Sequence, residues 1–449
     1  MSDLLAIGRS GVTAYRTALA AVGDNVVNAE SAGYSRRTVT LTESPVSSGT
    51  TVSYRAQTTF GGVNALGVER AWNDFKAADA RISAGDAGRA EARFRWLSTA
   101  ETALEDGDTG VGARLTAMFT AADALAADPG GDLPRRQMLL ALDDAVGTIR
   151  ATAETLARTA EGIAGEAQAS VDAINADLDA LGKLNVALRR AGVGTAAHAQ
   201  LADQRDQLID GLSAKIGIDV TFDEAGAVTI KLAGVSGATL LSGAQPARIG
   251  VDRAADGRLS LVLSGNVAPT PIFPQAGALA GLIDAAAMVA DRRAQLDGIA
   301  ADFAAALNGW QAQGLDANGQ PGAPLLTISG GAATLMLISS DPDAIAAAAP
   351  GGAANGNLLA LGALRGGDGA EQRWAGLVAG HAQFVAAARS ENAVASARRD
   401  GAFAARDAVT GVDLDQEAAE LIRFQQAYDA SSKIIQIARE TLQTILNLL

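Results

Sequence analysis

The chain has 449 residues with 50 acidic and 36 basic side chains, a net charge of −14 and no cysteine. Its length allows about three domains of ordinary size. An acidic surface with no basic run longer than pairs such as Arg36-Arg37 and Arg135-Arg136 argues against nucleic-acid binding. The missing cysteines exclude disulfides and zinc–thiolate sites, and with two histidines, His198 and His381, a multi-histidine metal site is not expected.

Nothing in the sequence predicts a membrane span or a cleaved signal peptide. A span needs about 18 to 20 apolar residues, whereas the most apolar window, 278–290, is mostly alanine and is interrupted by Asp284. The start, MSDLLAIGRSG, lacks a basic flank, a long apolar run and a small-residue cleavage site. We therefore expect no membrane insertion.

The first segment predicts a helix with one apolar seam. Spacings of three and four residues place six side chains on a single stripe, with Gly8 as its only weak position. The six are Leu5, Val12, Tyr15, Leu19, Val22 and Val26. Residues 28–33 end this helix, with Gly33 as a left-handed cap. The Ser-, Thr- and Gly-rich stretch that follows predicts a β-hairpin segment near 38–70.

Helical periodicity dominates from about residue 71 to residue 215. One helix is expected to end near residue 106, and the sequence Asp128-Pro129-Gly130-Gly131 separates two more. The second of these runs from about Leu133 to Ala191 with no proline after Pro134. Such a helix would span roughly 90 Å.

Between residues 216 and 275 the period changes from 3.6 to 2, which predicts a small antiparallel β insertion. Ile218, Val220 and Phe222 alternate with polar residues, and a turn at Gly226 leads into a second alternating run. Helical patterning resumes at 277–313. Two further helices are expected at about 371–407 and 414–449.

The last helix carries the sharpest signal in the sequence. Positions at alternating spacings of three and four residues run without a break along this helix. All of them are apolar except Glu417 and Ser431. The apolar positions that we expect to form an interface are Leu414, Leu421, Phe424, Tyr428, Ile435, Leu442, Ile445 and Leu449. A helix packed on its own globular core would show a similar seam. Because both chain ends carry a seam and are otherwise largely polar, we expect the two to pair as a coiled coil.

Together these elements predict a mainly α fold with a small β insertion (α+β). The N- and C-terminal helices would form a coiled-coil domain from residues 1–35 and 412–449. A mainly helical domain would comprise residues 36–215 and 276–411, and the antiparallel β insertion would comprise residues 216–275.

Two short motifs resemble ligand loops but lack the necessary context. Gly192, Gly194 and Ala197 spell G-x-G-x-x-A, yet a long helix rather than a strand precedes them. A calcium-like run starts at Asp316, but Pro321 stands where such a loop needs glycine. We therefore expect no enzyme, no catalytic residue, no cofactor and no metal. A nucleotide-binding enzyme built around the Gly192 loop is the remote alternative.

Motifs at the two ends are specific enough to indicate a family. The N-terminal ones are Ser10-Gly11-Val12, Ala14, Leu19, Asn25, Asn28 and Gly33-Tyr34-Ser35-Arg36. The C-terminal ones are Gly411-Val412-Asp413-Leu414-Asp415-Gln416-Glu417, Leu421, Arg423-Phe424-Gln425-Gln426 and Tyr428. They resemble the signatures of the bacterial flagellar axial proteins, the family of rod, hook and hook-associated proteins. The Gly-Tyr-Ser-Arg form is similar to that of the hook-associated branch.

Interior motifs resemble the hook-associated protein 1 members of that branch. They are Val68-Glu69-Arg70 with Phe75, Asp203-Gln204-Arg205-Asp206-Gln207-Leu208, Gly277, Leu279, Gly281-Leu282, Asn308, Gly314-Leu315-Asp316 and Gly319. The chain is short for such a protein, and the space around residues 265–276 leaves no room for a large extra outer domain.

The resemblance implies a structural subunit at the junction between flagellar hook and filament. Such a subunit assembles with copies of itself, with the hook subunit and with the second junction protein. It is exported through the flagellar type III channel without a cleaved signal, after a cytoplasmic chaperone has bound its C-terminal helix, and it works outside the cell. The alternatives within the family are the second junction protein and the hook subunit.

Overall fold

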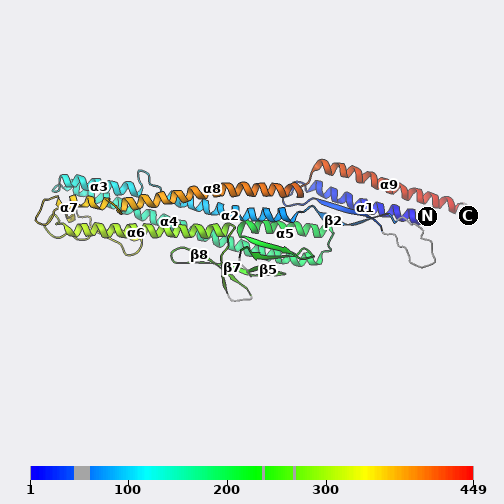
Figure 1. Ribbon diagram of the computed structural model, residues 1–449, viewed down its shortest axis with the longest axis horizontal. Coiled ribbons are helices and arrows are strands. Elements are labelled where there is room, and N and C mark those ends of the chain that lie inside the picture. Colours follow the sequence, from blue (N-terminus) through cyan, green and yellow to red (C-terminus); the bar gives the residue numbers. More distant parts are fainter. Residues whose placement is uncertain (1, 45–60, 235–237, 266–268, 448–449) are drawn as a thin grey trace. The chain divides into compact units, whose positions relative to one another are not determined.

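The computed structural model describes residues 2–44, 61–234, 238–265 and 269–447. Within them the fold is mainly α with small antiparallel sheets, as predicted (Figure 1). The chain forms two compact units. The first comprises Met1–Gly85, Ile174–Arg248 and Ser396–Leu449, and the second comprises Asp86–Ala173 and Ile249–Ala395. The three-domain organisation given above stays a prediction.

Helices, most of them long, supply most of both units. They are α1 (Ser2–Val27), α2 (Asp74–Ala103), α3 (Val111–Ala127), α4 (Asp132–Arg190), α5 (Ala196–Lys215), α6 (Ala278–Gln313), α7 (Gly356–Leu361), α8 (Ala370–Thr410) and α9 (Leu414–Leu446). Side chains just before α5 and α9 satisfy free backbone amides at the helix start. Thr195 accepts a hydrogen bond from the amide of His198, and Asp413 accepts from two amides of α9.

The predicted long helix is α4, which runs unbroken for 59 residues. The apolar side chains that defined its periodicity are at most 1% exposed, so the stripe is the buried face of the helix. In the second unit they are Leu156, Ile163 and Val171, and in the first they are Ile174, Leu178, Leu181 and Leu188.

The predicted antiparallel β insertion is present and comprises two small sheets. One sheet has the order β3 (Ile218–Phe222), β4 (Val228–Leu232), β5 (Thr239–Ser242), β6 (Gln245–Pro246), and the other β7 (Arg248–Arg253), β8 (Leu259–Ser264), β9 (Thr270–Ile272). Buried Asn185 of α4 holds the first sheet through hydrogen bonds with Val228 and with the carbonyl of Gly243. A further short pair joins β10 (Leu326–Thr327) to β11 (Met336–Leu337).

The predicted hairpin is formed by β1 (Arg37–Glu43) and β2 (Val63–Arg70), which pair antiparallel with a bulge between Thr40 and Leu41. The part of the prediction that falls on residues 45–60 lies outside the described residues. Gly33 has the left-handed φ of +73° that was expected. It lies well past the end of α1, however, so it shapes the turn into β1 and does not cap the helix directly.

Both weak ligand motifs are turns stabilised by the chain itself. The Gly192 loop connects α4 to α5, and the Gly194 carbonyl accepts a hydrogen bond from the amide of Val68. The Asp316 carboxylate accepts from the amides of Asn318 and Gln320. Across the described ranges, no cluster of three or more His, Cys, Asp or Glu side chains is placed to hold a metal. No helix found there combines the length and apolar character of a membrane span.

His381 of α8 makes the stability of the second unit sensitive to pH. The residue is 1% exposed, and its Nε2 donates to the carbonyl of Leu97 on α2. Burial lowers the pKa of His381 below its ordinary value. The ordinary pKa of histidine, about 6.5, applies to the unfolded chain. As the pH falls through this value, the unfolded chain therefore binds a proton at His381 that the folded chain does not bind.

We expect unfolding to become easier as the pH falls from about 7 towards 5, through the histidine pKa of the unfolded chain. His381→Gln should flatten that pH dependence, as measured by urea unfolding at a series of pH values. The matched control is His198→Gln, which changes the other histidine. Equal flattening by both variants would contradict the assignment to His381.

Candidate assembly site

The two ends of the chain pair as helices, as predicted, and the two helices run antiparallel (Figure 1). The rings of Tyr15 on α1 and Phe424 on α9 have centroids 6.3 Å apart. Towards the start of α1, Gly11 lies against Ser431 of α9. Towards its end, Asn25 contacts Glu417. Residue numbers therefore fall along α9 as they rise along α1.

Small residues form the closest contact between the two helices. The buried face of α1 consists largely of Gly8, Gly11, Ala14 and Ala18. A Cβ atom on Gly8 would lie 3.1 Å from the carbonyl oxygen of Ser431, a backbone atom that cannot rotate away. Gly8, the weak apolar position of the predicted seam, thus lies where the two helix backbones approach closely, and an added Cβ would be crowded there.

The predicted seam residues lie beside this contact rather than at its centre. Val22 is buried, whereas the half-buried positions are Leu5, Val12, Tyr15, Leu19, Leu421, Phe424, Tyr428, Ile435 and Leu442. Val26, Leu414 and Ile445 are exposed, and Leu449 lies outside the described residues. Their role as an assembly interface stays a prediction.

A buried polar cluster, which we call the terminal joint, closes the end of the helix pair. It consists of Asn25, Tyr34, Arg36, Arg37 and Glu417. The Asn25 amide group donates to the Arg37 carbonyl at 2.8 Å and to Glu417 Oε2 at 2.9 Å. Its oxygen accepts from the Arg37 amide and the Tyr34 hydroxyl. Glu417, fully buried, also accepts from Arg36 Nε at 2.6 Å.

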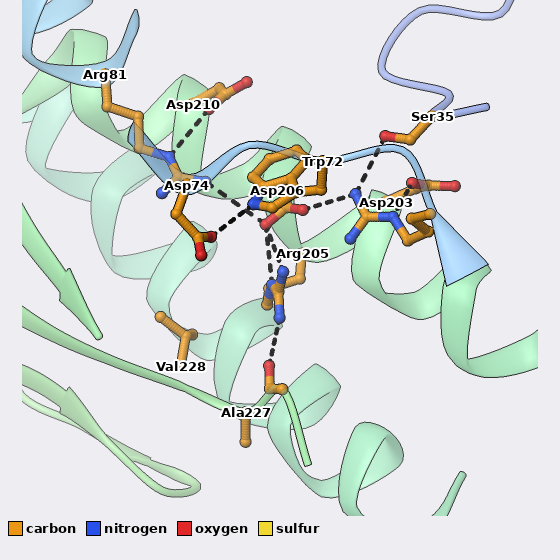
Figure 2. Close-up of polar contacts among 12 residues, drawn as sticks. Ser35, Trp72, Asp74, Arg81, Asp203, Arg205, Asp206, Asp210, Ala227 and Val228 are labelled. Carbon is orange, nitrogen blue, oxygen red and sulfur yellow. Dashed lines mark hydrogen bonds and ion pairs between the residues drawn. The ribbon is translucent and has the colours of Figure 1, made fainter. Parts of the chain in front are cut away.

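A second cluster, the α5 network, lies on one face of α5. Asp203, Asp206 and Asp210 of that helix meet Arg70, Arg81, Arg205 and Arg406. Figure 2 shows the three aspartates with Arg81 and Arg205. Arg70 spans two of these aspartates, with Nε 2.7 Å from Asp203 Oδ1 and a terminal nitrogen 2.8 Å from Asp206 Oδ2. Asp206 accepts further from its neighbour Arg205, so the network ties β2 to α5.

Arg37 links the two clusters. Its backbone is held by Asn25, while its guanidinium lies 3.3 Å from carboxylate oxygens of both Asp24 and Asp203. Burial raises the pKa of the Asp203 carboxyl above its ordinary value, and Arg70 opposes that rise. Burial likewise raises the pKa of Tyr34 to about 12, so its hydroxyl stays a donor to Asn25 at neutral pH.

Neither cluster was predicted as a site from the residues themselves. Arg70 and Asp203 entered only as parts of the motifs that carry the resemblance, whereas Arg36 was also noted in a basic pair and Glu417 as a polar exception to the seam. A signal was nevertheless present, because Asp203, Asp206 and Asp210 have the i, i+3, i+7 spacing of one helix face. The structure brings these motifs together, although they are far apart in the sequence.

Comparison with known proteins gives consistent relatives. A profile described as the flagellar hook-associated protein FlgK helical domain matches residues 97–326, and one for the flagellar basal body rod FlgEFG protein C-terminal region matches residues 408–448. Flagellar hook-associated protein 1 of Salmonella typhimurium is 26% identical over 344 residues, which cover 73% of this chain and 60% of that protein. The chain thus spans about three-fifths of that relative's length.

Other relatives extend the comparison. Flagellar hook-associated protein 1 of Bacillus subtilis is 25% identical over 498 residues, covering 99% of this chain and 97% of that protein. The solved structure of the flagellar hook junction protein FlgK from Burkholderia pseudomallei is similar with a TM-score of 0.55 and 16% identity, over 60% of this chain and 66% of that one. At that identity the structural likeness supports the fold alone.

We predict that Gly8→Ala weakens the helix pair by about 1 to 3 kcal/mol, because the added methyl group overpacks a backbone contact. Hydrogen exchange of the α9 amides measures the effect. Gly23→Ala is the control on the same helix, because a Cβ there would meet nothing within 4 Å. It should stabilise α1 by about 1 kcal/mol. Unaltered exchange in Gly8→Ala would contradict the close contact.

A second prediction concerns the α5 network. Asp206→Asn should lower the free energy of unfolding by about 3 kcal/mol, because it leaves buried guanidinium groups without their counter-charge. Urea unfolding of the full chain measures this loss. The control is Asp179→Asn, which disrupts an ion pair with Arg248 whose side chains are 37% and 55% exposed. That pair should contribute about 1 kcal/mol or less, and losses of similar size in both variants would contradict the prediction.

Proposed function

Because this chain belongs to the family of the flagellar hook-associated protein FlgK, we propose that it is a structural subunit of the bacterial flagellum that joins hook to filament as hook-associated protein 1. The observation that carries the proposal is the pairing of the two chain ends into one helical element. A subunit of a tube must present the same surface to each of its neighbours, and the paired terminal helices would supply such a surface.

Exposed apolar side chains on the helix pair support self-assembly. Ile422 and Ile437 of α9 are 55% and 59% exposed, and Val27 of α1 is 82% exposed. A concentration of exposed large apolar groups is typical of protein–protein contact surfaces. Copies of the same chain, the hook subunit and the second junction protein are the partners that we propose for them.

The alternatives have less support. A hook subunit was expected to carry mostly β-structure between its ends, whereas helices α2 to α5 dominate residues 74–215. The FlgK helical-domain profile also favours hook-associated protein 1 over the second junction protein. An enzyme built on the Gly192 loop would need a strand before the glycines, and α4 precedes them.

We predict that replacing Ile435 and Leu442 with Asp abolishes incorporation into the flagellum and leaves the rest of the protein folded. Each buried aliphatic side chain contributes roughly 1.5 to 3 kcal/mol, and a carboxylate in its place adds a desolvation cost. Two readouts are needed: thermal melting of the purified chain and filament formation in cells.

Lys433→Asp is the control, since Lys433 is exposed and lies off the seam. An unchanged melt with loss of filaments supports a junction subunit. Normal filaments from the double variant would overturn the proposal. A lower melting temperature of the whole chain would instead support a helix that merely packs on its own core.

We further propose export from the cytoplasm without a cleaved signal, to a position outside the cell at the hook–filament junction. An export chaperone would bind the α9 stripe that includes Leu421, Phe424, Ile435, Leu442 and Ile445 and prevent premature assembly. Deleting the residues after Thr410 removes α9 and keeps α8 intact. This deletion should abolish binding in a pull-down from cells, and equal binding by full-length and truncated chains would disprove the chaperone site.

A further inference from the structure

The buried carboxylate of Glu417 has an unusual set of partners. Only three residues of α9, Glu417, Ser431 and Ala438, are buried in the described chain, and Glu417 is the charged one. Burying a carboxylate costs several kcal/mol unless hydrogen bonds and opposite charge compensate. Within the described residues, both hydrogen bonds to Glu417 come from one short segment, through Asn25 Nδ2 at 2.9 Å and Arg36 Nε at 2.6 Å.

We call this segment, residues 25–37, the clasp. Most of the hydrogen bonds that hold the clasp together do not involve Glu417. Three of the four hydrogen bonds of the Asn25 side chain stay within the clasp, to Tyr34 and to both backbone groups of Arg37. The backbone of Arg36 is fixed elsewhere, because its amide donates to Thr410 and its carbonyl accepts from Ala71. The Arg37 guanidinium contacts Asp203 of α5.

The two halves of the terminal joint are therefore unequal. Without α9 the clasp keeps most of its hydrogen bonds, and the Arg36 guanidinium, 21% exposed even in the folded chain, can turn to water. Without the clasp, α9 cannot dock unless it buries an unpaired carboxylate. If either half is missing, the free-energy cost of an unsatisfied buried group therefore arises almost entirely from Glu417 on the C-terminal helix.

We propose that the clasp must form before α9 can dock, so that the two chain ends order in a fixed sequence with Glu417 as the positioning residue. A chain whose N-terminal segment is unfolded or absent then keeps its C-terminal helix undocked. This inference concerns the order of folding and stands independently of the proposed function.

A cysteine-free chain allows a direct test, because two introduced cysteines have only each other as intramolecular partners. Tyr15→Cys and Phe424→Cys suit the purpose, because these two side chains face each other across the helix pair, with ring centroids 6.3 Å apart, and neither position belongs to the close glycine contact. The rate of cross-linking by a mild oxidant in dilute protein reports how often α9 is docked. Hydrogen exchange of residues 25–37 reports the clasp.

In this cysteine background, Glu417→Ala should slow cross-linking at least about tenfold, the effect expected for lost hydrogen bonds to a charged group, while exchange in the clasp stays at the parental level. Asn25→Ala should slow cross-linking similarly and also speed exchange at residues 34–37. Glu417→Gln, which keeps an acceptor oxygen, should give an intermediate rate. Glu420→Ala, which removes the partner of Arg423 on the same helix, is the control and should leave the rate unchanged.

Three outcomes would overturn the proposal. The first is a parental rate of cross-linking in Glu417→Ala. The second is an equal loss of protection in the clasp and in α9 in that variant, which would mean that the two halves fold as one. The third is no cross-link in the parental cysteine pair. Exchange in α5 serves as the internal reference that the remainder of the first unit is folded.

Discussion

The carboxylate of Asp206 accepts hydrogen bonds from Arg70 and Arg205 and lies 3.6 Å from Arg81, with all of these side chains largely buried. This contact lies at the centre of the face of α5 on which four other segments converge. The hairpin arrives through Arg70, α2 through Arg81, and α8 through Arg406, which pairs with Asp210. The terminal helix pair is attached to the same face through Arg37 and Asp203.

Such an arrangement fixes how these segments are placed on α5 more than it adds to the free energy of unfolding. Buried ion pairs recover little more than their desolvation cost, so well-packed apolar residues could stabilise the fold equally well. An apolar patch would, however, tolerate sliding, whereas a guanidinium that bridges two carboxylates accepts few alternatives. The terminal pair follows the same principle, because its contact of glycine, alanine and serine buries little apolar surface and the terminal joint fixes its register.

The helices were predictable because burial of one face imposes a 3.6-residue period on the sequence, and α4 and α9 show it over long runs. The polar clusters could not be predicted in this way, because the periodicity identifies buried positions only where their side chains are apolar. Glu417 counted as an exception to its seam although it is the most buried residue there. In α1 the large apolar side chains were predicted to form the interface, whereas the closest contact with α9 is formed by Gly8 and Gly11. The division of the β insertion was hidden for a similar reason, since both sheets share the period of 2.

The hydrogen bond between Asn25 and Glu417 joins residues 392 positions apart, so the helix pair closes a loop that contains nearly the whole chain. The entropy of closing a flexible loop rises only with the logarithm of its length. An insertion of a hundred residues between the two ends would therefore add only a few tenths of a kcal/mol to that cost. Subunits whose middle portions differ greatly in size can close the same pair of ends almost equally well, which leaves the middle of the chain free to vary in length.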